Sequence, residues 1–238
     1  MSEPGTRQLP LALRYPPDQR FETCVGIAPE ALAQLRALAA GDADEADNAG
    51  VYLAGPSGTG KTHLALATCA AAEAAGRNAA YLPLQAASGR MRDALDALER
   101  ATVVALDGID AIAGNRDDEI ALFDFHNRAR AAGVALLYAG RAAPDGLAPA
   151  LPDLRSRLSQ CARIVLAPLD DDGRREVLRE RARRRGLSVD PAALEWLMRR
   201  VGRDLGGLAR LFDRLDQASL AAQRKLTVPF LRETLRED

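Results

Sequence analysis

The sequence has 238 residues, of which 47% are hydrophobic and 27% are charged, and its formal net charge is −1. This length and apolar content suffice for one domain with a smaller appendage or for two compact domains, and they exclude general disorder. The near-zero net charge excludes a global field that attracts nucleic acid or an anionic membrane. The three cysteines, Cys24, Cys69 and Cys161, lack metal-like spacing and indicate buried thiols in a reducing compartment. Because charges or prolines interrupt every long apolar run, we expect a soluble cytoplasmic protein without a signal peptide or a membrane span.

The first predicted element with a clear chemical meaning is an apolar strand at 51–54, which a glycine-rich loop joins to an alanine-rich helix at 64–75. The loop matches the pattern GxxxxGK[ST] and consists of Gly55, Pro56, Ser57, Gly58, Thr59, Gly60, Lys61 and Thr62. Its glycines let backbone N–H groups turn toward phosphate oxygens, and the start of the helix adds further donors. Lys61 is expected to reach the outer phosphates, and the Thr62 hydroxyl to coordinate Mg²⁺. The loop therefore predicts a site for ADP or ATP with Mg²⁺.

Farther along the chain, apolar runs alternate with helical patterns. The predicted strands lie at 79–82, 102–106, 134–139 and 164–166, and the predicted helices between them at 89–100, 117–132 and 151–159. This alternation predicts an α/β fold in which a five-stranded parallel sheet has helices on both faces. After residue 168 the pattern becomes helical throughout, with a basic helix up to residue 185 and further helices at 191–201, 204–224 and 228–235. We predict a tail at 1–20, an α/β nucleotide-binding domain at 21–167 and a small all-α lid domain at 168–238.

The strand at 102–106 is followed directly by a carboxylate, Asp107. A parallel strand places such an acid at the carboxyl edge of the sheet, beside the phosphate loop, where it holds Mg²⁺ or its water. Gly108 stands where many P-loop ATPases carry a second acid that activates water, and Asp110 is the nearest substitute. Because a general base must lie within hydrogen-bond reach of the attacking water, Gly108 predicts weak hydrolysis by this chain alone. The two histidines, His63 and His126, form no metal or nucleophile set, and we expect His126 to be structural.

Several further segments resemble a known family. They are the phosphate loop, Asp107, the segments 112–115 and 123–128, and the run from Leu151 to Leu158 that reads LPDLRSRL. Together they resemble the AAA+ P-loop ATPases related to the bacterial replication initiator DnaA, and more narrowly the Hda family of regulatory inactivators of DnaA. The resemblance extends from about residue 21 to residue 235, and its part most specific to Hda is 218–231. The initiator has a helix-turn-helix domain after its lid, whereas this sequence ends at Asp238, so we expect no sequence-specific DNA binding.

The resemblance implies roles for two arginines. Arg157 matches the arginine finger that points at the γ-phosphate held by a neighbouring subunit, although Arg155 lies close enough to be the alternative. A guanidinium supplied in trans neutralises charge on the transferring phosphoryl group, and it accelerates related reactions by about 10³ to 10⁵. Arg203 matches the lid arginine that senses the nucleotide. Arg141 departs from the family pattern, because it follows the strand at 134–139 where a polar sensor is usual; it is expected to contact phosphate or to cap a neighbouring carboxylate.

The N-terminal tail contains a second implied site. Residues 8–13 resemble the short motif through which Hda docks on the DNA polymerase sliding clamp. Pro10 lowers the entropy lost when the segment becomes ordered, Leu9, Leu11 and Leu13 would fill an apolar cleft, and the Gln8 amide would bond to backbone groups. The resemblance thus implies two partners, the sliding clamp and DnaA, and it is compatible with homo-oligomers.

These inferences lead to one main functional hypothesis. The protein binds ADP or ATP, docks on the DNA-loaded clamp and presents Arg157 to ATP on DnaA, which prevents re-initiation of replication. The nucleotide in this chain then serves mainly to fix its conformation. The alternatives are a self-sufficient AAA+ ATPase that loads or remodels a protein, a clamp-binding scaffold that needs no nucleotide, and, least supported, a small-molecule kinase.

Overall fold

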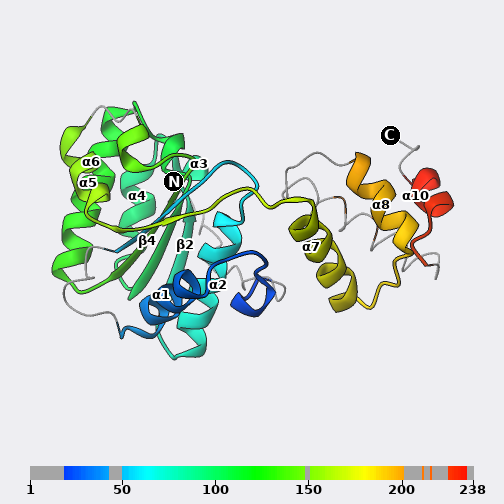
Figure 1. Cartoon of the computed structure of the whole chain (residues 1–238). Coiled ribbons are helices and arrows are strands. Elements are labelled where there is room, and N and C mark those ends of the chain that lie inside the picture. The colour runs from blue at the N-terminus through cyan, green and yellow to red at the C-terminus, as the bar shows by residue number, and fades with distance from the viewer. Residues whose placement is uncertain are drawn as a thin grey trace, which may run out of the picture.

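The computed structural model describes residues 19–42, 50–147, 151–200, 211, 215 and 225–234. They form an α/β part followed by a group of helices that lies to one side of it (Figure 1). The strands are β1 Val51–Ala54, β2 Ala79–Pro83, β3 Val103–Asp107, β4 Ala135–Gly140 and β5 Ala162–Val165. The helical elements of the α/β part are η1 Phe21–Thr23, α1 Pro29–Ala40, α2 Lys61–Ala74, α3 Leu84–Ala87, α4 Met91–Asp96, η3 Ile109–Ala111, α5 Arg116–Ala131, η4 Pro144–Gly146 and α6 Pro152–Ser159. Those of the second group are α7 Asp171–Arg184, α8 Pro191–Arg200 and α10 Val228–Thr234.

The strands form a single sheet in the order β2-β3-β4-β1-β5, and every pair is parallel. The predicted five-stranded parallel sheet is thereby confirmed. The central strands are buried on both faces, which explains why they are continuous apolar runs rather than alternating ones. All five strands end at the same edge, which places the ends of β1, β3 and β4 together. The chemistry predicted for residues that follow these strands is therefore concentrated at one edge of the sheet.

The two faces of the sheet are covered by different helices (Figure 1). One face, which we call the α2 face, packs on η1, α1 and α2 through a cluster that includes Phe21, Leu35, Leu53, Leu64, Ala105, Leu137 and Ile164. The other, the α5 face, packs on α4, α5 and α6 through a cluster that includes Tyr52, Met91, Leu106, Leu122, Phe125, Tyr138, Leu154 and Leu158. Successive buried residues of β1, β3 and β4 alternate between the two faces of the sheet, as the period of two in a strand requires.

Local sequence signals explain where the helices begin and end. The Asn115 side chain caps α5 by accepting a bond from the Asp118 backbone N–H, and Asp170 caps α7 in the same way with Gly173. Acids in the first turns and arginines in the last turns of both helices suit the helix dipole. Helix α1 begins with Pro29 at its first position and ends before Gly41, whose φ is 85°. The Asn115 cap agrees with the predicted start of α5, which was correct within one residue.

Some predicted bounds were wrong. The helix predicted at 89–100 is only the short α4, and the strand predicted at 164–166 is β5, which begins two residues earlier. Neither α1 nor α3 was predicted. Helix α1 has Leu32, Leu35 and Leu38 at helical spacing, a signal that could have predicted it, whereas α3 is a single turn and too short for a periodic pattern.

The second group of helices has a core of its own. Helices α7, α8 and α10 pack through residues that include Leu178, Ala182, Leu194, Leu197, Leu226, Phe230 and Leu231. The predicted helix at 204–224 lies mostly outside the described residues, although Leu211 and Leu215 are helical. A contact between the two parts joins the Arg184 guanidinium, a donor on α7, to the Glu22 backbone carbonyl at 3.3 Å. The start of the α/β part thus lies against the helical group.

Candidate functional site

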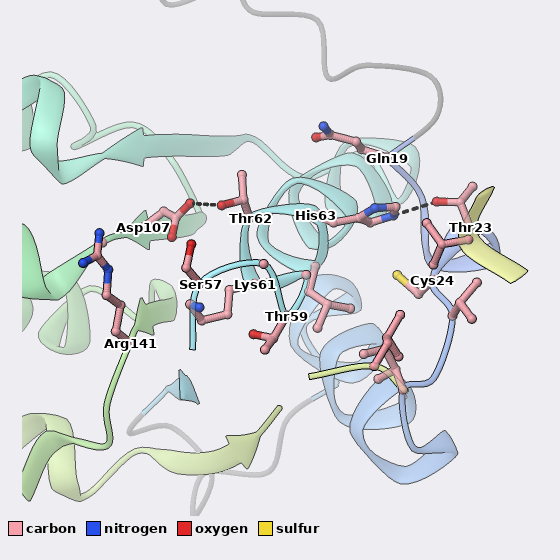
Figure 2. Close-up of a pocket in the computed structure, with 18 of the residues that line it drawn as sticks. Gln19, Thr23, Cys24, Ser57, Thr59, Lys61, Thr62, His63, Asp107 and Arg141 are labelled. Atoms are coloured by element: carbon pink, nitrogen blue, oxygen red, sulfur yellow. Dashed lines mark hydrogen bonds between the residues drawn. The ribbon is translucent and has the colours of Figure 1, made fainter. Parts of the chain in front are cut away.

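A cavity of about 820 Å³ lies at the carboxyl edge of the sheet. Its walls come from three places: the phosphate loop with the ends of β3 and β4, the segment 19–27, and helix α7. Figure 2 shows Ser57, Lys61, Thr62, Asp107 and Arg141 at one end and Thr23, Cys24 and His63 at the other. A cavity of this size at this edge is typical of a site for a nucleotide-sized ligand.

The predicted phosphate loop runs from β1 into α2 and lines the cavity. Gly58 and Gly60 have φ values of 78° and 92°, a conformation that favours glycine. At Gly55 a Cβ would lie 2.4 Å from the Leu166 carbonyl oxygen, so a larger residue does not fit there. Among the described residues, no recorded hydrogen bond uses the backbone N–H of Gly58, Gly60 or Lys61. These donors and the start of α2 therefore suit an anionic group at this position.

Lys61 extends along the loop. Its Nζ donates to the Gly55 carbonyl at 2.6 Å and to the Pro56 carbonyl at 2.7 Å. Thr59 also donates to the Pro56 carbonyl, at 3.0 Å, which fixes the shape of the loop. Burial lowers the pKa of Lys61, and the carboxylates of Asp107 and Asp110 oppose that shift. The cation is therefore held in a partly desolvated site, where its interaction with phosphate is stronger than in water.

Asp107 is the last residue of β3, and two hydroxyl groups converge on its Oδ2. Thr62 Oγ1 donates at 2.6 Å, as Figure 2 shows, and Tyr81 OH donates at 2.9 Å. Burial and the Asp107 charge raise the pKa of Tyr81, which keeps its hydroxyl protonated. Mg²⁺ takes hard oxygen ligands and usually only one or two from the protein when it also binds phosphates, so Thr62 and Asp107 fit this ion. The contact of Tyr81 with Asp107 was not predicted, because the sequence does not reveal the order of the strands, which brings β2 beside β3.

The position after Asp107 lacks an acid, and the nearest carboxylate is paired. Gly108 has a φ of 88°, and the chain then forms the short helix η3. Asp110 accepts a hydrogen bond from the backbone N–H of Arg141, and the Arg141 Nε lies 3.4 Å from its Oδ2. Of the two positions expected for Arg141, contact with phosphate or with a carboxylate, the structure has the second. The nearest candidate base is therefore engaged by a cation.

The opposite end of the cavity is built from the segment 19–27, which the sequence analysis assigned no role. Thr23, Cys24, Val25 and Ile27 line it together with Leu169 and Val177. His63, next to the phosphate loop, joins this segment to α2, because its Nε2 lies 2.6 Å from Thr23 Oγ1 and 3.1 Å from the Arg20 carbonyl oxygen. This mixed apolar and polar wall suits the base of a nucleotide. The sequence signal that could have found it was the position of His63 directly after Thr62.

The cysteines and the second histidine have structural surroundings. Cys69 and Cys161 are buried as predicted, whereas Cys24 is only half-buried in the cavity wall. Burial raises the pKa of Cys24 and of Cys161 to about 12, so both thiols are protonated. His126 on α5 is fully buried, and its Nδ1 lies 2.8 Å from Tyr138 OH. Burial is the largest cause that lowers the pKa of His126 to about 4, so the ring is neutral near pH 7.

Helix α7 contributes a charged wall. Glu180, Arg181 and Arg184 line the cavity. Glu180 accepts hydrogen bonds from Arg183 and Arg184, at 2.7 Å each, and these bonds lower the pKa of Glu180 to about 2. The predicted lid arginine, Arg203, lies outside the described residues. Arg181 and Arg184, which belong to the predicted basic helix, had no predicted role, yet both line the cavity.

The two candidate finger residues lie on α6, away from the cavity. Neither Arg155 nor Arg157 is among the described residues that line it. Arg155 is exposed, and Arg157 is half-buried on the side of α6 that faces α5. The Arg157 charge is near enough to His126 to help lower the pKa of that ring. The candidate tail residues Gln8, Leu9, Leu11 and Leu13 lie outside the described residues.

Comparisons with known proteins agree with this architecture. Residues 51–164 match the family model of the ATPases associated with various cellular activities (AAA), and residues 171–235 match the Hda lid domain. The chain is a Hda/DnaA-like AAA+ protein. The first match covers the α/β part and the second covers the helical group. The predicted fold class, an AAA+ α/β domain followed by a helical lid, is thereby confirmed.

Solved structures of similar fold include members of this group. Domain III of the Thermotoga maritima replication initiation protein DnaA superposes with a TM-score of 0.77 at 16% identity, covering 94% of this chain and 98% of that one. AMPPCP-bound DnaA from Aquifex aeolicus gives 0.66 at 17% identity, covering 87% and 67%. The Thermotoga maritima RuvB Holliday junction branch migration motor gives 0.59 at 21% identity, covering 89% and 70%. At these identities the likeness concerns the AAA+ fold. Among the described residues of this Hda/DnaA-like chain, none of the helices is long and apolar enough to cross a bilayer.

Proposed function

We propose that this Hda/DnaA-like protein binds ADP or ATP with Mg²⁺ and, docked on the sliding clamp, stimulates hydrolysis of ATP bound to the initiator DnaA. The observation that carries the proposal is a nucleotide-type cavity whose candidate base is paired with a cation, together with two arginines that lie on α6 outside that cavity. The match of residues 171–235 to the Hda lid domain supports the choice of DnaA as partner. Such hydrolysis converts active initiator to its ADP form and prevents premature re-initiation, in the cytoplasm.

The residues of the cavity have distinct proposed roles in holding the nucleotide. The free N–H groups of the phosphate loop bind phosphate oxygens, and Lys61 turns its Nζ from the loop carbonyls to the outer phosphates. Thr62 and Asp107 hold Mg²⁺, which when bound neutralises phosphate charge. The segment 19–27 receives the base. Arg203 is proposed to contact the nucleotide from the lid, in the manner of the family's lid arginine.

Hydrolysis by this chain alone is proposed to be weak. Gly108 supplies no carboxylate, and Asp110 is engaged by Arg141 through a backbone N–H and the guanidinium. These contacts occupy the Asp110 carboxylate, so it is not free to orient an attacking water. The bound nucleotide then acts as a ligand that selects one conformation rather than as a substrate.

Arg157 is the proposed arginine finger. It lies on a two-turn helix that Leu154 and Leu158 fix against the α5 face, so its position is set by a rigid element. Its half-buried side chain is more constrained than that of Arg155, which is exposed. Constraint favours Arg157, because a preorganised guanidinium loses less entropy when it stabilises the transition state.

The proposed clamp contact uses Gln8, Leu9, Leu11 and Leu13 of the tail. Its support is the motif itself, since an extended leucine-rich segment with a glutamine is a typical peptide ligand for an apolar cleft. Docking raises the local concentration of the protein near DNA-bound initiator and requires no groove-reading domain.

The central experiment measures hydrolysis of ATP bound to DnaA with and without this protein, clamp and DNA. All three together should accelerate it, and Arg157→Ala should abolish the acceleration, whereas the matched variant Arg155→Ala should retain most of it. Replacing Gln8 and Leu9 by alanine should remove the clamp dependence and leave nucleotide binding unchanged. Absence of acceleration with all components present contradicts the proposed function.

The rival function is a self-sufficient AAA+ ATPase that loads or remodels a protein. It is distinguished by turnover of the purified protein alone. Brisk ATP hydrolysis without a partner, lost in Arg157→Ala, would identify self-assembly with Arg157 acting between copies of this chain. A clamp-binding scaffold would instead keep its function in Lys61→Ala.

A further inference from the structure

Glu119 lies in the first turn of α5 and is completely buried, although it takes no part in the cavity. Its two carboxylate oxygens have different backbone partners. Oε1 accepts the Gly114 N–H at 2.6 Å, and Oε2 accepts the Leu151 N–H at 2.6 Å. Gly114 belongs to the turn that follows η3, and Leu151 is the N-cap residue of α6. One side chain therefore connects the region after β3 with the start of the helix that carries Arg157.

The strength of this connection follows from its chemistry. A carboxylate that accepts backbone N–H groups forms charge-assisted bonds, and both bonds here are short. The Glu119 side chain is fully buried, whereas Gly114 is exposed and Leu151 is half-buried, so loss of the carboxylate removes both charge-assisted bonds that tie these two donors to α5. The left-handed φ of Gly114, 92°, orients its N–H as part of a tight turn. The three segments are thereby held in one arrangement.

The turn at Gly114 belongs to a hydrogen-bonded unit that begins at the Mg²⁺ side of the cavity. The backbone N–H groups of Gly108, Ala111 and Asn115 donate to the carbonyls of Ala139, Gly108 and Ile112, at 2.9, 2.8 and 2.9 Å. Ile109 and Ile112 anchor the same unit in the core. Since Asp107, Gly108, Asp110 and Ala111 line the cavity, a shift of this edge on nucleotide binding also moves the turn that Glu119 holds.

The second bond of Glu119, to the Leu151 N–H, is at the start of the helix that carries Arg157. Arg157 is six residues beyond Leu151, which is about 9 Å along a helix. Leu154 and Leu158 pack α6 on the α5 face, so its inner side is fixed by apolar contacts and its N-terminal end by Glu119. A change at that end alters the direction of the helix and the position of the Arg157 guanidinium.

We propose that Glu119 is a positioning residue that couples the nucleotide state of this chain to the position of helix α6 and hence of Arg157. The coupling rests on the proposed function, because it concerns the arginine offered to the partner. Nucleotide with Mg²⁺ fixes the edge from Asp107 to Gly114, Glu119 transmits that order to Leu151, and α6 becomes firmly held. The neighbouring acid, Asp118, makes no recorded bond to α6 among the described residues: its Oδ2 accepts from Ser88 and Gly89, which precede α4, and from the Asn115 side chain.

The test that needs no partner is amide hydrogen exchange of the full-length protein with and without ADP and Mg²⁺. In the unmodified protein, nucleotide should slow exchange of the backbone amides of Leu151, Asp153 and Leu154. In Glu119→Gln their exchange should be about tenfold faster, and the effect of nucleotide should be lost, because an amide presents an N–H to one of the two donors. The affinity for labelled ADP should change less than about twofold, since Glu119 does not touch the cavity.

Two further variants distinguish a specific loss of the nucleotide effect from a general disturbance of the structure. Glu119→Asp keeps the charge but is one carbon shorter, so it cannot reach both donors and should also lose the nucleotide effect. Asp118→Asn removes a neighbouring buried carboxylate and should keep that effect. Unchanged nucleotide-dependent protection in a folded Glu119 variant, or its absence in the unmodified protein, overturns the proposal, as does its loss in Asp118→Asn.

A partner assay tests the link to Arg157. Glu119→Gln should lower the maximal rate of hydrolysis of DnaA-bound ATP about tenfold, with little change in the concentration that gives half-maximal stimulation. In an Arg157→Ala background the same change should have no further effect, and an additional loss there contradicts action through Arg157. Where the unmodified protein gives no stimulation, the proposed function fails, and the exchange experiment still decides the role of Glu119.

Discussion

The two faces of the sheet use their buried polar groups differently. Among the described residues, the buried polar side chain on the α2 face is Thr68, and Thr59 is buried in the phosphate loop; helix α2 consists largely of alanine and leucine. On the α5 face the buried polar residues are ionisable, Asp118, Glu119 and His126, and each bonds to another segment. The first face thus leaves its backbone donors at the edge for a ligand. The second uses side chains to fix helices relative to one another.

This contrast suggests that the two faces serve different parts of the proposed function. Residues at the start of α2 should govern nucleotide affinity, and residues of α5 and α6 should govern how the chain acts on a partner. Asp107 and Asp110 lie at the edge between the faces. Substitutions on the two faces should therefore have different effects, and measuring these effects tests the division.

The largest effect is expected for Lys61→Ala. Loss of two charge-assisted bonds to phosphate should weaken ADP binding on the order of a thousandfold, or about 4 kcal/mol. Titration with fluorescent ADP measures this. The matched control is Lys225→Ala, which removes the other of the two lysines in the sequence and should bind normally. Retained affinity in Lys61→Ala would place the ligand elsewhere.

A pH effect of similar size is expected on the α5 face. The pKa of His126 is lowered to about 4 in the folded state, against about 6.5 unfolded, so the unfolded chain binds the proton more readily between these values. Stability that is present near pH 7 should therefore fall by about 2 to 3 kcal/mol between pH 6.5 and 4, and this contribution should level off below pH 4. Urea unfolding at both pH values measures it.

The control for that prediction is His126→Phe, which removes the titrating ring and keeps a bulky apolar one. Its loss of stability between the two pH values should be smaller by this amount. An equal loss in both proteins would assign the acid sensitivity to other groups. Nucleotide affinity at pH 7 should be the same in both, as the division between the faces requires.

At the edge of the sheet, Asp107→Asn should lower Mg²⁺-dependent ADP affinity about tenfold, because an amide binds the ion more weakly than a carboxylate. Asp110→Asn should change it less than about twofold, since Asp110 is held by Arg141. Titrations with and without excess EDTA separate the contribution of Mg²⁺. Equal effects of the two substitutions would show that both carboxylates face the ion.

The smallest effect concerns Arg141→Ala. Release of Asp110 should raise the slow intrinsic ATP hydrolysis by about threefold to tenfold, well below the effect of a well-placed general base. Phosphate release under single-turnover conditions measures this rate. The double variant with Asp110→Asn should return to the original rate, and a rise that persists there contradicts the role given to the carboxylate.

The fold and part of the site followed from local patterns. The run from Gly55 to Thr62 and the strand before Asp107 carry their meaning in consecutive residues, so the parallel sheet and the phosphate loop could be predicted. Tyr81 and Glu119 could not, because their partners lie in other strands and helices whose order and register no local pattern specifies. Asp110 could be named but not its pairing with Arg141, 31 residues away.

The cavity wall formed by residues 19–27 has a geometric consequence for the proposed docking. Gln19 lines the cavity, and it follows Leu13 of the tail motif by only six residues, which span at most about 20 Å. If the clamp binds Leu13, the wall of the nucleotide cavity therefore lies within about this distance of the clamp surface. The distance from the clamp at which Arg157 can meet a partner is then limited by this segment and by the size of the α/β part. It does not depend on the length of the DNA that the clamp encircles.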